Sequence, residues 1–122
     1  AGTAAIGTIS TPSGSNIAVT SAASTNATLV KSTAGTIFEL TASNPTVTAV
    51  HVKLYNKATA PTVGTDIPVL TIPLPAGSVQ QFPFGQIGKR FATGIGMAIT
   101  AGALATDTAV SVAGVQVHGT YI

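Results

Sequence analysis

The chain has 122 residues, of which 7% are charged and 45% are apolar, and its formal net charge is +2. This length fits one domain with a core of its own, and the lack of cysteine excludes disulfides, thiolate metal sites and a cysteine nucleophile. Because an average soluble domain has about 25% charged residues, this composition favours a subunit that packs against neighbours in an assembly, although secreted β-proteins can share it.

Residues 1–26 contain no charge and no aromatic ring, and their only larger apolar side chains are Ile6, Ile9, Ile17 and Val19. Such a segment cannot bury enough apolar surface to offset the entropy lost on ordering. We therefore predict an extended N-terminal arm, either a flexible tail or a strand added to a neighbouring subunit. We favour strand addition, because it needs only main-chain hydrogen bonds, and the four apolar residues are candidate contacts.

Residues 27–122 predict a β-sandwich domain. Short runs in which apolar and polar residues alternate predict strands, and they lie at 28–31, 35–42, 47–56, 69–74, 79–84, 94–101 and 113–122. No segment longer than ten residues has a helical period. About seven to eight short strands separated by turns indicate a sandwich or a small barrel. We expect an all-β fold, an antiparallel, jelly-roll-like sandwich.

The clearest strand is 47–56, in which Val50, Val52 and Leu54 share one face. The other face is expected to meet solvent or a partner, and it holds His51, Lys53 and Tyr55. In segment 35–42, the same alternation places Phe38 and Leu40 on one side. Prolines and a glycine in 57–68 predict a long surface loop.

The stretch FPFGQIGKRFATGIGMAIT, at 82–100, raises the question of a phosphate-binding loop. Such a loop needs GxxxxGK followed by Ser or Thr before a helix, and this stretch has neither the spacing nor the hydroxyl residue. The other basic residues of the chain are scattered outside this stretch, whereas a nucleic-acid-binding protein presents a clustered basic face. The stretch therefore predicts a structural corner, and nucleic acid is not an expected partner.

In this corner, Phe82 and Phe84 are expected to face the core and Phe91 to re-enter it. Gly85 and Gly88 would turn the chain. A second pair of glycines, Gly94 and Gly96, would allow a close backbone approach.

Lys89 and Arg90 form the only pair of adjacent charges and are expected at the tip of the corner. They are candidate interaction residues. We expect an ion pair within the chain or between subunits, with Glu39 or Asp107 as its carboxylate or with a carboxylate of a partner.

The sequence does not predict an enzyme. A zinc site would need both histidines, His51 and His118, together with carboxylates. The three carboxylates are far apart in the sequence, and no GxSxG motif occurs. We therefore expect no catalytic residue, no metal, no cofactor and no small-molecule ligand. No run of about 18 apolar residues occurs, so no membrane span is expected.

The order of these segments resembles small structural proteins of tailed bacteriophages, in particular the β-sandwich head decoration (cement) proteins. The likeness covers roughly 29–122. It rests on the opening strand GTIFEL at 35–40, HVKLYN at 51–56, a Pro/Gly loop at 60–68, and the segment from FPFG to ATGI at 82–95.

This resemblance implies a virion protein on the outer surface of the capsid. It implies a homotrimer that contacts the major capsid protein and reinforces the shell by bridging neighbouring capsid subunits. The arm would clamp those neighbours.

Two other classes stay open. One is a head-fibre, tail or carbohydrate-recognition sandwich, for which Tyr55 is the one candidate sugar-stacking residue beside His51. The other is a secreted matrix or pilus-like subunit, which would need a processed leader.

Overall fold

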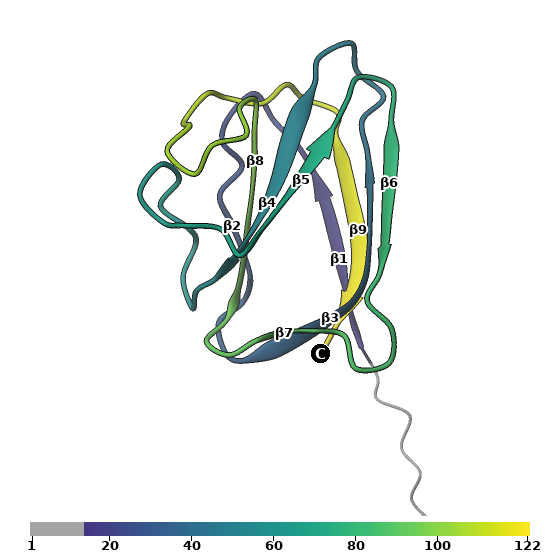
Figure 1. The fold of residues 1–122 in the computed structure, drawn as a ribbon, viewed down its shortest axis with the longest axis vertical. Coiled ribbons are helices and arrows are strands. Elements are labelled where there is room, and N and C mark those ends of the chain that lie inside the picture. Colours follow the sequence, from purple (N-terminus) through teal and green to yellow (C-terminus); the bar gives the residue numbers. More distant parts are fainter. Residues whose placement is uncertain (1–13) are drawn as a thin grey trace, which may run out of the picture.

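A computed structural model describes residues 14–122 of the chain, and in this part every regular element is a β-strand (Figure 1). Most strands contain alternating or continuous apolar residues, and Gly, Pro, Ser, Thr and Asn are frequent in the turns between them. The nine strands are β1 (Ser15–Thr20), β2 (Thr28–Lys31), β3 (Gly35–Ser43), β4 (Val50–Asn56), β5 (Leu70–Leu74), β6 (Val79–Pro83), β7 (Lys89–Phe91), β8 (Ile95–Thr100) and β9 (Gln116–Tyr121).

The strands form two antiparallel sheets. The first sheet has the order β1-β9-β3-β6, with β7 also paired to β3, and the second has the order β2-β8-β4-β5. Apart from the short β7, the chain passes between the sheets in the eight-strand pattern of a jelly roll. The predicted all-β, jelly-roll-like sandwich is thus confirmed.

The core lies between the two sheets. It contains Ile37 and Leu40 from the first sheet and Val52, Leu54 and Met97 from the second, all at most 1% exposed. Each side chain of this size contributes about 1.5–3 kcal/mol when it is fully buried. The two sheets are therefore held together mainly by apolar packing.

A bulge in β3 breaks the alternation expected for 35–42. The pairing of β3 with β9 shifts register between Ile37 and Glu39, which inserts an extra residue into β3. As a result Ile37 and Leu40 both face the core, while Phe38 lies on the outer side. The expectation that Phe38 and Leu40 share a face was wrong.

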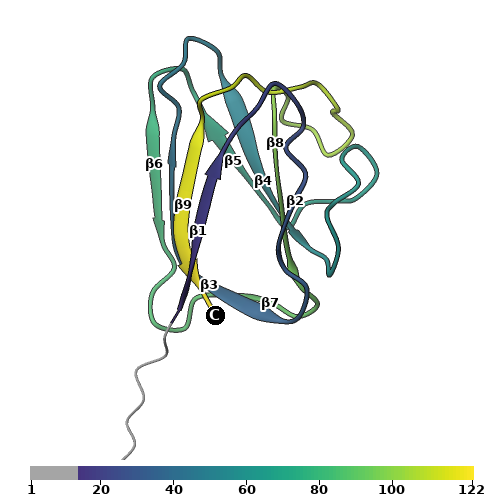
Figure 2. The same ribbon diagram turned by 180° about the vertical axis from the view of Figure 1, so that it is seen from behind.

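The fold begins earlier than the predicted arm boundary at residue 26. Strand β1 pairs along its whole length with β9 of the same chain, and Figure 2 shows the two strands side by side. Ile17 is 4% exposed and belongs to the core, and Val19 packs against that core. Both residues therefore stabilise their own subunit, contrary to the expected contact with a neighbour.

Ile6 and Ile9, the other candidate contacts of the arm, lie outside the described residues. Strand β7 was not among the predicted strands, and its three residues pair with the first part of β3.

Candidate functional site

The outer face of the second sheet is covered by two loops, residues 57–69 and 101–109, which we call the loop layer. Pro61 lies over Gly96 of β8, where an added Cβ would be 3.2 Å from the proline Cδ. The second loop closes through Ala101 N–H, which donates to Ala109 O at 3.0 Å. Figure 1 shows both loops on the same side of the molecule.

The loop layer buries side chains of β4 that were expected on an open face. Tyr55 is 1% exposed and Lys53 is fully buried. Tyr55 therefore cannot offer its ring to a sugar, and its expected role as an exposed stacking residue was wrong. His51 is half-buried.

Two residues of β4 anchor the 101–109 loop. Lys53 Nζ donates to Leu104 O at 2.7 Å. His51 Nδ1 lies 3.1 Å from Ala101 O, and since a carbonyl can only accept, Nδ1 carries the proton there. Burial lowers the pKa of Lys53, and the nearby Asp107 carboxylate partly offsets this.

The 57–69 loop is closed by an ion pair. Asp66 Oδ2 accepts hydrogen bonds from Lys57 Nζ at 2.5 Å and from the backbone N–H of Thr62 at 2.7 Å. The bond from Lys57, followed by that from Thr62, lowers the pKa of the Asp66 carboxyl group. The ionised Asp66 carboxylate therefore links the two sides of this loop at neutral pH.

The two loops touch each other and present apolar side chains outward. A Cβ added to Gly64 would lie 2.5 Å from Thr108 Cγ2, so the loops are in direct contact there. Ile67 is 80% exposed and Leu104 is 71% exposed. Sequence reasoning missed both residues, although an isoleucine within the polar segment TDIP indicates an exposed apolar side chain.

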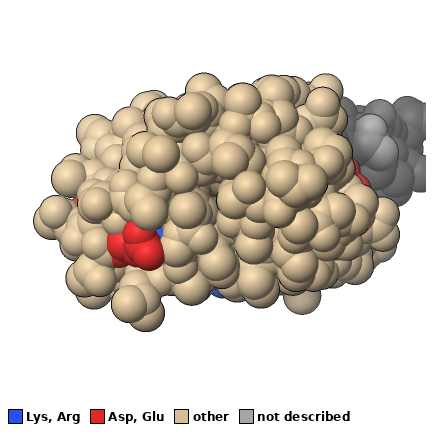
Figure 3. Space-filling model, turned by 90° about the horizontal axis from the view of Figure 1, so that it is seen from above, with Lys and Arg blue, Asp and Glu red and all other residues tan. Residues whose placement is uncertain are grey.

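Charged side chains are sparse on the surface around this layer. Figure 3 shows the molecule from above, with a cluster of acidic atoms and only traces of other charged side chains among uncharged residues. Lys57 and Asp66 form the one salt bridge within residues 14–122. This surface offers neutral contacts to a partner.

The Lys89–Arg90 pair lies in β7, at the edge of the first sheet, where it pairs with Ile37 and Thr36 of β3. The expectation that it lies at the tip of the corner was wrong. Arg90 is exposed and Lys89 is half-buried. In the described part of the chain, neither forms a salt bridge with Glu39 or Asp107. The pair is thus placed for a contact outside its own subunit, which stays a prediction.

The corner around this pair has the expected build. Gly85 and Gly88 both have positive φ, at 82° and 74°. Phe91 is 1% exposed, while Phe82 and Phe84 stack with ring centroids 6.3 Å apart and pack against the core. The expected close backbone approach occurs at Gly94, where the chain passes so near to Lys57 O that an added Cβ would clash with it.

The two histidines do not come together. His51 is on β4 and His118 on β9, so they belong to different sheets and lie on opposite outer faces. Among residues 14–122, no group of three or more His, Cys, Asp or Glu residues could hold a metal ion. The same residues include no helix able to cross a membrane.

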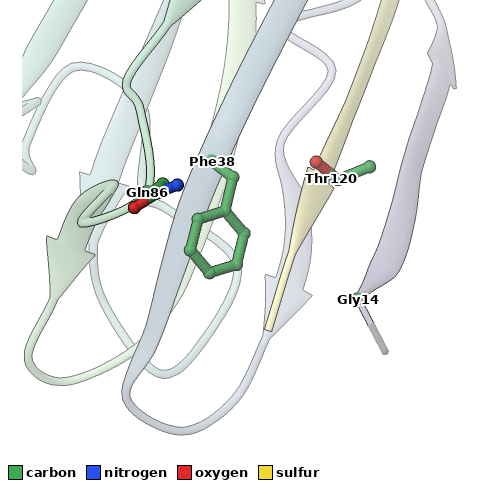
Figure 4. A pocket seen from close by; sticks show the side chains of 4 residues that line it. All are labelled: Gly14, Phe38, Gln86 and Thr120. Carbon is green, nitrogen blue, oxygen red and sulfur yellow. The ribbon is translucent and has the colours of Figure 1, made fainter. Parts of the chain in front are cut away.

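A hollow lies at one end of the first sheet. It is lined by Gly14, Phe38, Gln86 and Thr120, and Figure 4 shows the Phe38 ring between Gln86 and Thr120. The ring is there because the β3 bulge turns Phe38 outward. Its lining contains no charged side chain among the described residues.

No protein-family model, no curated protein and no solved structure matches this chain.

Proposed function

We propose that this protein is a non-enzymatic virion structural protein that decorates a capsid and reinforces it by bridging neighbouring capsid subunits. The observation that carries the proposal is a set of large apolar side chains exposed on connections between strands, in a chain poor in charge. They are Val47, Ile67, Ile87 and Leu104, each more than 70% exposed. Exposed apolar side chains of this size gain free energy when a partner covers them.

The construction of the loop layer supports the proposal. Lys53 fixes the 101–109 loop, and the Lys57–Asp66 pair closes the 57–69 loop. Loops already held in one conformation lose less entropy when a partner binds. Ile67 and Leu104 are thus presented to a capsid surface by a preorganised support.

The fold and the sequence also support the proposed function. Jelly rolls recur in viral capsid and lectin domains, and the segments from 29 onward resemble phage head decoration proteins. In the proposed assembly, trimers contact the major capsid protein on the outer surface. Many copies convert weak single contacts into high avidity. They would thereby reinforce the contacts between capsid subunits in a shell strained by packaged DNA.

The test compares particles with and without the protein. We expect particles that lack it to release DNA at lower temperature and on transfer to low salt, and added purified protein to restore wild-type stability. Equal stability of both kinds of particle would overturn the proposal.

The same assay tests the loop layer. An Ile67→Asp, Leu104→Asp double variant should fold normally but fail to restore particle stability, because it adds charges to an apolar contact. Val79→Asp is the matched control, since Val79 is 59% exposed but lies on β6. Full restoration by the double variant would remove the loop layer from the contact.

A further inference from the structure

The edge strands of the two sheets differ in how they are protected against pairing with another chain. Natural edges are blunted by prolines, charges, bulges or short length. Strand β6 contains Pro83 and β5 contains Pro73. Strand β2 has four residues, with a register shift before Lys31. Each of these three edges carries at least one such device.

Strand β1 carries none of them. Its six residues, SNIAVT, include no proline and no charge, and they pair with β9 without a register shift. On its other side no strand of residues 14–122 is paired with it, and Figure 2 shows it at the border of its sheet. The strand is therefore a template for one more strand.

The main-chain groups that face this open side can be identified. Ser21 N–H donates to Val115 O at 2.7 Å, so the N–H of Ser21 points toward β9. Because N–H directions alternate along a strand, those of Ile17 and Val19 also face β9. The groups of Asn16, Ala18 and Thr20 then point away from the sheet, and the side chains of these three residues are exposed.

We infer that β1 pairs antiparallel with β1 of a second copy of this chain, around a two-fold axis at Ala18. In this register Ala18 faces Ala18 of the second copy, and Asn16 faces Thr20. Ile17 and Val19 come together on the inner side, where Val19 is only partly buried in one subunit. The pairing joins two first sheets into one continuous sheet.

A second copy is the occupant because the strand is self-complementary. No side chain of β1 is charged, so two copies do not repel each other, and a two-fold contact closes without forming a fibre. In an antiparallel pair, the start of one β1 lies at the end of the other, so the two ends of the contact are alike. The contact is separate from the loop layer and does not depend on the proposed function; in the proposed assembly it would link a subunit of one trimer to a subunit of a second trimer.

Cysteine cross-linking tests this register directly, since the chain contains no cysteine. Directly opposite residues in a hydrogen-bonded antiparallel pair have Cα atoms about 5.5 Å apart, a separation that a disulfide can span. We expect full-length Ala18→Cys to form a disulfide-linked dimer several-fold faster than Gln81→Cys under mild oxidation. Gln81 is the matched control, because it is exposed on the β6 edge. Equal rates would overturn the inference.

Proline substitution provides the second measurement. Ala18→Pro removes a donor that faces away from β9, so the subunit should fold while its molar mass by light scattering falls by half. Gln81→Pro should leave the mass unchanged, because β6 already holds Pro83. An unchanged mass for a folded Ala18→Pro variant, or a monomeric wild type, would overturn the inference. If Ala18→Pro does not fold, the cross-linking rates decide.

Discussion

Lys53 is a fully buried cation in a chain with few charges. Its stem crosses the outer face of the second sheet, and its ammonium group donates to Leu104 O. Burial disfavours the charged form, so the pKa of Lys53 is lowered from the ordinary value of 10.5. This residue therefore couples the anchoring of the 101–109 loop to pH.

We predict that the free energy of unfolding rises with pH as the pH approaches the ordinary lysine pKa of 10.5, and that Lys53→Met removes this rise. The folded protein releases the Lys53 proton below pH 10.5, whereas the unfolded chain keeps it up to that pH. The unfolded state then binds more protons, and stability increases with pH by at most about 1.4 kcal/mol per pH unit. Urea unfolding of both proteins as the pH is raised measures it; equal slopes would contradict the prediction.

Tyr55 carries the one buried side-chain polar atom of the described residues that has no hydrogen-bond partner, its hydroxyl oxygen. An unpaired buried hydroxyl destabilises a fold by about 1–3 kcal/mol. We predict that Tyr55→Phe raises the free energy of unfolding by about 1 kcal/mol, measured by urea denaturation at pH 7. A clear loss of stability would show that the hydroxyl binds a partner such as an internal water.

At the scale of the strand, β4 shows what local pattern could and could not establish. The alternation of VHVKLYN correctly placed Val50, Val52 and Leu54 in the core. It also predicted an open face for Lys53 and Tyr55, and that was wrong. The cover over Lys53 includes Leu104, whose carbonyl accepts its hydrogen bond from 51 positions later in the chain. A period within one strand carries no information about so distant a loop.

Strand β1 and the β3 bulge show two different limits. Ile17 and Val19 alternate with Ala18 and Thr20, so a period-two signal was present in β1, but the lack of charge around it favoured an arm. The bulge near Phe38 leaves no comparable signal. Its position depends on the register between β3 and β9, which are separated by some seventy residues.

The turn between β6 and β7 gives a matched pair of glycines. Both Gly85 and Gly88 have positive φ, but a Cβ on Gly85 meets nothing within 4 Å, whereas one on Gly88 would lie 2.8 Å from Ile37 O. We predict that Gly85→Ala costs about 1–2 kcal/mol of stability, from backbone strain alone. Gly88→Ala should cost a further 1–3 kcal/mol or so from crowding. Equal losses in thermal or urea unfolding would contradict this.

At the scale of the molecule, the two outer faces differ. The second sheet is covered by the loop layer, while the first sheet presents its strands directly. A row across that open face runs through Ala18, His118, Thr41 and Gln81 in register. This row contains no Asp, Glu, Lys or Arg, but Glu39 on β3 and Arg90 on β7 are exposed in the same sheet and could supply charge-based contacts there.

Part of the candidate contact surface could be read from the sequence. The loop at 57–68 and the Lys89–Arg90 pair were both expected at the surface, and Arg90 is exposed. Leu104 could not be recognised, because AGALAT resembles the buried apolar segment before it. Its exposure follows from the Lys53 anchor, a contact between residues 51 positions apart.

Arg90 provides the test that separates assembly from folding. It is exposed on β7 and forms no salt bridge within residues 14–122, so its charge contributes little to the stability of one subunit. We predict that Arg90→Glu changes the free energy of unfolding by less than about 0.5 kcal/mol but weakens assembly with its partner at least several-fold, because a carboxylate partner would then be repelled. Unfolding of the isolated protein and its binding to capsids or to itself measure the two effects.

Lys31→Glu, which makes the same charge change on β2, is the control and should leave assembly unchanged. A large loss of stability with unchanged assembly would place the role of Arg90 inside the fold.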